Sequence, residues 1–239
     1  TNGVFNTNND FTLISNSSAT ARIAEITGGD ITGDVVMQRY IDGGATGWHF
    51  ISTPVSGTTL NDWDQEMILS CDDCINGLAG SSYSVYRYNE SAPGTNDNGY
   101  VALTSIGDAI NADEGYWVYT GTGPTTTNPF TFDVKGPANK FATSLSVAYT
   151  DNGLPDDDGW NMVSNPYPST VDWDAAGWTK DFIDNSIYVW DPDGQVYASY
   201  VGGVGSNGGS QFVPSSQAFW VKANSAPTLT ITEPVKSSQ

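Results

Sequence analysis

The feature that most constrains this chain is an internal repetition: five short segments of its first part return, in the same order, in its second part. Residues 47–54 (GWHFISTP) match residues 159–166 (GWNMVSNP). The four later pairs keep similar spacing and are Asp62-Trp63 with Asp172-Trp173, 85–89 with 187–191, 114–118 with 217–221, and 130–132 with 229–231. Five matches in one order indicate that a single unit was duplicated.

The matched segments are predicted to be β-strands. Their apolar residues are β-branched or aromatic, and the runs are short and bounded by clusters of turn residues. Pro54 and Pro166 follow the first segment of each copy and, lacking an N–H donor, should end that strand. With 26 Gly and 12 Pro to form turns, the chain is predicted to be an all-β, antiparallel β-sandwich of jelly-roll-like type with two repeated halves.

The two halves are expected to divide at the acidic linker near Thr150. Residues 1–150 would hold the first sandwich half together with extra N-terminal strands, and residues 151–239 would hold the second half. The halves either form two lobes or pack together as one domain.

Helical signal is scarce. The best candidate is 60–69, with Asn61 or Asp62 as its N-terminal cap, and residues 174–178 are expected to form the matching turn of the second copy. Both are expected to lie over the ends of the sandwich.

The charge balance excludes two classes of partner. Eight Lys and Arg against 27 Asp and Glu give a formal net charge of −19, which repels phosphate backbones and anionic lipid heads. No apolar run reaches the roughly 20 residues of a membrane span. We therefore expect no nucleic-acid binding and no membrane insertion.

An acidic, lysine-poor surface suits an extracellular medium. Residues 1–10 do not resemble a signal peptide, so we expect the chain to be part of a longer precursor.

The only two cysteines are Cys71 and Cys74, which enclose Asp72 and Asp73. Redox chemistry of the thioredoxin type needs a lowered thiol pKa, whereas two aspartates act in the opposite direction. One His in the chain also disfavours a four-ligand zinc site. The pair is interpreted as a small local disulfide or as two inactive thiols.

Several of these segments resemble a module of large surface proteins of Bacteroidota. The resemblance is carried by residues 31–41 followed by 47–55, by 159–169 followed by 172–174, and by 202–222. It covers nearly the whole chain. It implies a part of multi-domain, adhesin-like proteins exported by the type IX secretion route, with the sorting signal elsewhere in a longer parent chain. It implies no catalytic site and no particular ligand.

A calcium site is the first hypothesis for chemistry. Residues 151–159 (DNGLPDDDG) carry four carboxylates and an amide in the loop that joins the copies, and calcium takes six to eight oxygen ligands. The predicted ligands are Asp151, Asp156, Asp157 and Asp158. The loop does not follow the EF-hand pattern, and the alternative is a solvated acidic turn.

Carbohydrate binding is the second hypothesis, because sugar rings stack on exposed aromatic faces. Tryptophans shared by both copies are better explained as core positions: Trp48 with Trp160, Trp63 with Trp173, and Trp117 with Trp220. Aromatic residues unique to one copy, near the glycine-rich loop 202–209, are therefore the predicted contacts: Trp178, Tyr197 and Tyr200. Their alternative is ordinary partial burial.

Catalysis is the weakest hypothesis. The lone His49 lies within a predicted strand, its counterpart in the second copy is Asn161, and no Gly-x-Ser-x-Gly motif is present. No local motif selects a pair of carboxylates for glycoside cleavage. The sequence thus predicts a non-catalytic, extracellular module for adhesion or attachment to a polysaccharide or cell-surface glycan. A purely structural spacer of a large adhesin is the alternative, and the two differ in whether aromatic residues form a concave exposed patch.

Overall fold

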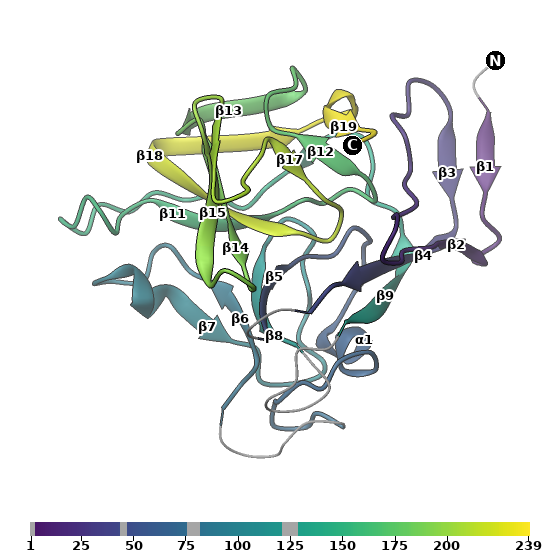
Figure 1. The fold of residues 1–239 in the computed structure, drawn as a ribbon, viewed down its shortest axis with the longest axis horizontal. Helices are drawn as coiled ribbons and strands as arrows, with labels where there is room; N and C mark the ends of the chain where they lie inside the picture. Colours follow the sequence, from purple (N-terminus) through teal and green to yellow (C-terminus); the bar gives the residue numbers. More distant parts are fainter. Residues whose placement is uncertain (1–2, 44–46, 76–81, 121–128) are drawn as a thin grey trace.

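The computed structural model describes residues 3–43, 47–75, 82–120 and 129–239. Strands dominate this part of the chain, and the helical segments within it are short (Figure 1). Most strand pairs are antiparallel. The prediction of an all-β fold is therefore confirmed.

Apart from a two-stranded sheet at its N-terminus, the first part of the chain forms two sheets. One has the order β5-β8-β6-β7, and the other has the order β2-β4-β9. The bounds of these strands are Phe11–Leu13 (β2), Asp34–Ile41 (β4), Trp48–Ile51 (β5), Val85–Tyr88 (β6), Tyr100–Ala102 (β7), Tyr116–Tyr119 (β8) and Phe130–Pro137 (β9).

The second part is organised around one long strand, β18. It pairs with β10, β11, β13 and β14, and the sheet continues through β15 to β16. A smaller sheet has the order β17-β12-β19. The bounds are Thr143–Ser144 (β10), Trp160–Ser164 (β11), Thr170–Asp172 (β12), Trp178–Ile183 (β13), Ser186–Asp191 (β14), Val196–Val201 (β15), Val204–Ser206 (β16), Phe212–Val213 (β17), Ala218–Ile231 (β18) and Lys236–Ser237 (β19).

The matched segments of sequence pair with the same register in both parts. Phe50 lies opposite Trp117 in the β5–β8 pair, and Met162 lies opposite Trp220 in the β11–β18 pair. The third strands, β6 and β14, pair with Trp117 and Trp220 respectively. β18 covers in one continuous strand the residues that match both β8 and β9.

Buried side chains form two large clusters. One draws on residues 13–138 and the other on residues 145–235. Trp63 is fully buried in the first and Trp173 in the second, so the core positions predicted for this pair are confirmed. The predicted boundary near Thr150 remains a prediction, and the change from one cluster to the other falls between Ala138 and Leu145.

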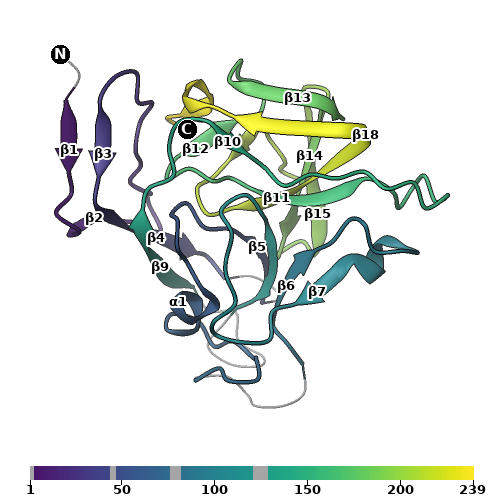
Figure 2. The same ribbon diagram turned by 180° about the vertical axis from the view of Figure 1, so that it is seen from behind.

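A third cluster joins the two parts. Phe50 packs there with Met162, Ala218 and Trp220. Backbone bonds reinforce the contact, since the Gly115 N–H donates to the Met162 carbonyl at 3.0 Å. These contacts hold both parts in one packed body (Figure 2).

The N-terminal strands form an arm at one side of the molecule (Figures 1 and 2). β1 (Val4–Asn6) pairs with β3 (Asp30–Thr32), and both this pair and β2–β4 are parallel. The sequence predicted antiparallel pairing here. The difference arises because some twenty residues separate β2 from β4, enough chain to cross over and return in the same direction.

The helix is shorter than predicted. α1 spans Leu60–Asp64 rather than 60–69, and Thr59, not Asn61 or Asp62, precedes its first residue. The Asp62 carboxylate accepts a bond from the Thr59 N–H at 2.7 Å, which satisfies a donor at the helix start. Residues 174–178 form turns and the start of β13.

Cys71 and Cys74 form a disulfide. The turn that it closes is fixed to a neighbouring loop, because Asp73 accepts bonds from the Ile106 N–H at 2.8 Å and from the Ser105 hydroxyl at 3.0 Å. The local disulfide interpretation is therefore the correct one of the two.

Replacing both cysteines by serine is expected to lower the free energy of unfolding by about 2 kcal/mol, the loop-closure value for so short a loop. Urea unfolding of the oxidised wild type and of the Cys71→Ser/Cys74→Ser variant measures this difference. Far-UV circular dichroism should be unchanged. A variant that fails to fold would contradict the expectation, because it would give the bond a role beyond local closure.

No helix in the described ranges has both the length and the apolar character needed to cross a membrane.

Candidate functional site

An aromatic groove of about 400 Å³ lies where the two parts of the chain meet. Its walls come from β6, β7, β11, β14, β15 and β18, together with the 3-10 helix Asn96–Gly99 and the loop before β11. The lining residues are Tyr88, Asn96, Asp97, Tyr100, Asp156, Trp160, Tyr188, Tyr197 and Trp220. We call this site the aromatic groove.

Strand alternation places the rings in the groove. Successive residues of a strand point to opposite faces, so Phe219 and Val221 enter the core while Trp220 between them faces the other way. Tyr88 and Tyr100 are cross-strand partners in the β6–β7 hairpin and therefore share one face.

Trp220 forms the centre of the ring arrangement. Tyr88 lies 4.6 Å from it between ring centroids, and Tyr100 and Trp160 each lie 6.3 Å away. All three rings stand at 84–85° to the Trp220 plane. Edge-to-face contacts of this kind are favourable and fix the rings with several faces turned in different directions.

The charged side chains that line the groove are both acidic. Asp97 and Asp156 line it, and no Lys or Arg is among the described lining residues. Burial raises the pKa of the Tyr88 hydroxyl to about 12, with Glu90 and nearby aspartates adding to the shift. Burial likewise raises the pKa of Tyr100 far above its ordinary value, with a further contribution from Asp97.

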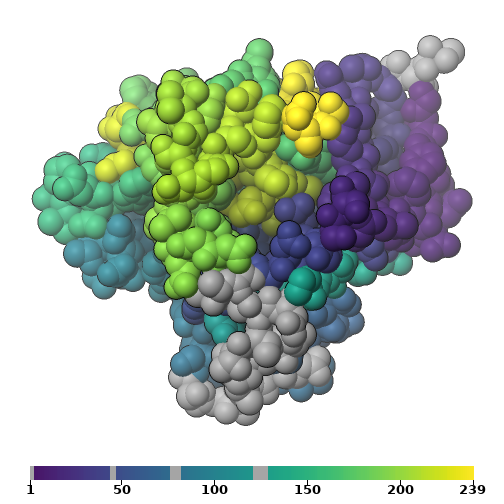
Figure 3. Space-filling model, in the orientation of Figure 1, coloured from purple at the N-terminus to yellow at the C-terminus, as the bar shows by residue number. Residues whose placement is uncertain are grey.

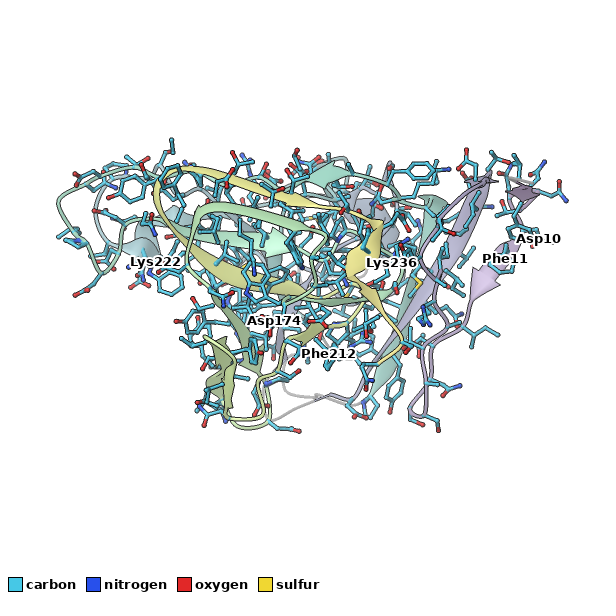
Figure 4. The ribbon with its side chains drawn as sticks, turned by 90° about the horizontal axis from the view of Figure 1, so that it is seen from above. Asp10, Phe11, Asp174, Phe212, Lys222 and Lys236 are labelled. Atoms are coloured by element: carbon cyan, nitrogen blue, oxygen red, sulfur yellow. A yellow bond between two sulfur atoms is a disulfide. The ribbon has the colours of Figure 1, made fainter. Side chains whose placement is uncertain are left out.

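The loop formed by residues 150–159 supports the groove from the second part of the chain. The Trp160 Nε1–H donates to the Asp156 carbonyl at 2.9 Å. The Lys222 ammonium donates to the Pro155 carbonyl at 2.8 Å and lies 5.2 Å from the centroid of the Trp160 ring. Lys222 thus holds the loop against Trp160, at the end of the molecule opposite to the N-terminal arm that carries Phe11 (Figure 4).

Glu90, from the first part, fastens both ends of that loop. Its buried carboxylate accepts bonds from the Thr150 N–H at 2.7 Å, the Thr150 hydroxyl at 2.9 Å and the Gly159 N–H at 3.1 Å. The Asn96 N–H also donates to the Asp157 carboxylate at 3.3 Å. The loop and the 90–100 segment consequently lie side by side at one end of the molecule (Figure 3).

No family model, no curated protein and no solved structure matches this chain.

The four predicted calcium ligands are arranged in different ways. Asp158 is buried and accepts bonds from the backbone N–H groups of Asn152 and Leu154, and Asp151 accepts one from Gly153. Asp157 receives the bond from the 3-10 helix described above, and Asp156 lines the groove. Within the described residues, no three His, Cys, Asp or Glu side chains gather in a way that could hold a metal ion. Calcium binding stays a prediction.

Of the three predicted carbohydrate contacts, only Tyr197 lines the groove, and it is 45% exposed. Tyr200 is buried and its hydroxyl donates to the Asp174 carboxylate. Trp178 packs on Trp173, and its Nε1–H donates to the Asp172 carbonyl at 2.8 Å. Tyr200 and Trp178 thus lie apart from the aromatic groove.

Sequence reasoning missed most of the groove, and it assigned Trp160 and Trp220 to the core. Both have core-like neighbours, yet both also line the groove. The sequence of β14, SIYVWD, did contain a signal for the groove. Side chains alternate along a strand, so Tyr188 and Trp190 lie on the face opposite the buried Ile187. A sheet with apolar residues on both faces has something packed or bound on each.

Proposed function

We propose that this chain is a non-catalytic extracellular module that binds carbohydrate in the aromatic groove. The observation that carries the proposal is the groove itself: six aromatic rings and three polar side chains around about 400 Å³. Ligand sites of this size typically combine apolar walls with a few polar groups that fix orientation.

The chemistry of the lining fits a sugar. Sugar rings present apolar C–H faces that pack on aromatic rings, and hydroxyl groups that need hydrogen-bond partners around the rim. Here Tyr188 and Tyr197 supply ring surface and phenolic oxygens, while Asn96 and Asp97 supply an amide and a carboxylate. The rings are already positioned by one another, so little ordering accompanies binding.

We also infer that the two parts of the chain are copies of one sandwich unit, with residues 1–150 and 151–239 as the two halves. Equal register in the β5–β8 and β11–β18 pairs supports this, as does the equivalent burial of Trp63 and Trp173. A jelly-roll-like sandwich is the architecture that we assign to each.

An extracellular setting is part of the proposal. A disulfide persists in oxidising compartments, and a net charge of −19 keeps a surface protein soluble in salt. The resemblance to modules of Bacteroidota surface proteins exported by the type IX route supports a role as part of an adhesin-like chain. A spacer role would leave its aromatic residues buried, whereas Tyr197 is 45% exposed in a concave site.

Replacing Tyr197 by alanine is expected to weaken glycan binding about tenfold, because a stacked ring contributes on the order of 1.4 kcal/mol. A glycan array identifies a bound sugar for the wild type, and calorimetry with that sugar compares the variants. Tyr149→Ala, which removes an exposed ring outside the groove, is the matched control and should bind normally. A wild-type chain that binds no glycan would overturn the proposed function.

A further inference from the structure

We propose that the aromatic groove is selective for a positively charged ligand, and that its sugars are amino sugars with a free, protonated amine. This inference rests on the proposed function and names its ligand class. Three independent features of the groove carry it: the arrangement of its rings, the sign of its charges, and the way in which this chain uses its other aromatic rings.

The rings form an edge-to-face cluster, which we call the cage, rather than a flat platform, and Trp220 at its centre is 6% exposed. Tyr88, Tyr100 and Trp160 each stand nearly perpendicular to Trp220, and Tyr88 and Tyr100 stand at 81° to each other. A flat sugar face needs one extended plane, whereas a compact cation can approach the exposed faces of rings that are turned in different directions. The geometry therefore favours an ammonium group over an uncharged ring alone.

The charged side chains that line the groove are both carboxylates, while the Lys222 ammonium lies over the Trp160 ring. Asp97 contributes to raising the pKa of Tyr88, Tyr100 and Tyr197, so its negative potential reaches three of the lining rings. For each of these hydroxyls, burial is the larger cause. A second lining carboxylate, Asp156, adds to the field, and the net charge of −19 extends it beyond the groove.

The chain pairs most of its lysines with aromatic rings, and one of these rings, Trp160, belongs to the groove. Of its five lysines, four lie over a ring face: Lys140 over Phe141, Lys180 over Trp173, Lys222 over Trp160 and Lys236 over Tyr167. Within the described ranges, no Lys or Arg contacts the faces of Tyr88, Tyr100 or Trp220 in this way. Apart from Trp160, which already has Lys222 over it, the rings of the cage therefore offer to a ligand the interaction that the other rings make with lysine.

The expected order of affinity follows from these features. A glucosamine oligosaccharide should bind most tightly, its N-acetylated counterpart more weakly because acetylation removes the charge, and a uronate oligosaccharide most weakly because its carboxylates are repelled. The preference should fall with added salt, since part of it is electrostatic.

Calorimetry with glucosamine and N-acetylglucosamine oligosaccharides of equal length, at about pH 6 and about 0.15 M salt, tests the inference. The wild type should prefer the charged oligosaccharide by about tenfold. Asp97→Asn should reduce that preference to about threefold or less. Asp151→Asn, an exposed change of the same charge outside the lining, should leave it unchanged. Unaltered melting temperatures confirm that both variants are folded.

The outcomes separate the two proposals. Equal or stronger binding of the N-acetylated oligosaccharide, or a preference that Asp97→Asn and Asp151→Asn reduce to the same degree, overturns the selectivity and leaves carbohydrate binding standing. A wild type that binds only neutral or acidic glycans on an array also overturns the selectivity and leaves carbohydrate binding standing. If no glycan of any class binds, the proposed function and this inference fail together.

Discussion

Replacing Glu233 by glutamine is expected to lower the free energy of unfolding by about 3–5 kcal/mol. Glu233 lies in the 3-10 helix Glu233–Val235 and is buried, as is its partner Lys236, with which it forms an ion pair at 2.9 Å. Removing one member of a buried pair leaves the other charge without compensation, and that loss accounts for most of the expected effect.

The carboxylate also joins distant segments. It accepts bonds from the Ile26 N–H at 2.7 Å and from the Phe141 N–H at 2.8 Å, so it connects the N-terminal segment, the segment between the two cores and the C-terminal end of the chain. The Lys236 ammonium, for its part, lies 4.7 Å from the centroid of the Tyr167 ring. A glutamine at position 233 keeps only one acceptor oxygen and no charge, so it loses the ion pair with Lys236 and can accept only one of the two backbone bonds in the same way.

Chemical unfolding of the variant and the wild type measures the effect. Glu66→Gln, which changes an exposed carboxylate, is the matched control and should shift stability by less than about 0.5 kcal/mol. Adding Lys236→Met to Glu233→Gln should recover part of the loss, since no buried charge then remains unpaired. A loss below about 1 kcal/mol for the single variant would show that the pair contributes little.

The lone histidine should make stability fall as the pH is lowered from about 6.5 to about 4, by about 3 kcal/mol in total. His49 lies in β5 and is 8% exposed. Burial lowers its pKa from 6.5 to about 4, with Asp193 acting weakly in the opposite direction. Between these two values the unfolded chain binds a proton that the folded chain excludes, so acid favours unfolding.

A single-histidine protein makes this prediction easy to check. The imidazole resonances in a proton NMR titration should move at about pH 4 rather than near 6.5. The variant His49→Asn, which installs the residue found at the matched position 161, should remove this part of the pH dependence. Equal slopes of stability against pH for wild type and variant would contradict the account.

The strands of this fold are largely predictable from sequence because their signal is local. Alternation and β-branched or aromatic runs mark β5, β8 and β11, and Pro54 and Pro166 follow β5 and β11 closely. The burial of Trp63 and Trp173 follows from their recurrence beside the same aspartate. Of the recurring tryptophans, Trp63 and Trp173 lie in the two cores, whereas Trp160 and Trp220 line the groove.

The aromatic groove is not predictable in the same way, because it depends on how the two parts pack. Trp220 has the sequence context of a core residue, and only its contacts with Tyr88 and Tyr100 from the other part turn it into the centre of a cage. Tyr197 was found because it is unique to one copy. The parallel pairing of β2 with β4 was missed because crossover connections carry no local signal.

Because residues from both parts of the chain line the groove, ligand binding there has a mechanical consequence. Tyr88 and Tyr100 belong to the first part of the chain, before residue 139, whereas Trp160, Tyr197 and Trp220 belong to the second part, after residue 144. A ligand bound in the groove would therefore contact both parts. Ligand binding in the groove and the packing of the two parts of the chain are then thermodynamically linked. A bound ligand would raise the free energy needed to separate the two parts. Tension strong enough to pull them apart would, by the same linkage, release whatever the groove is holding.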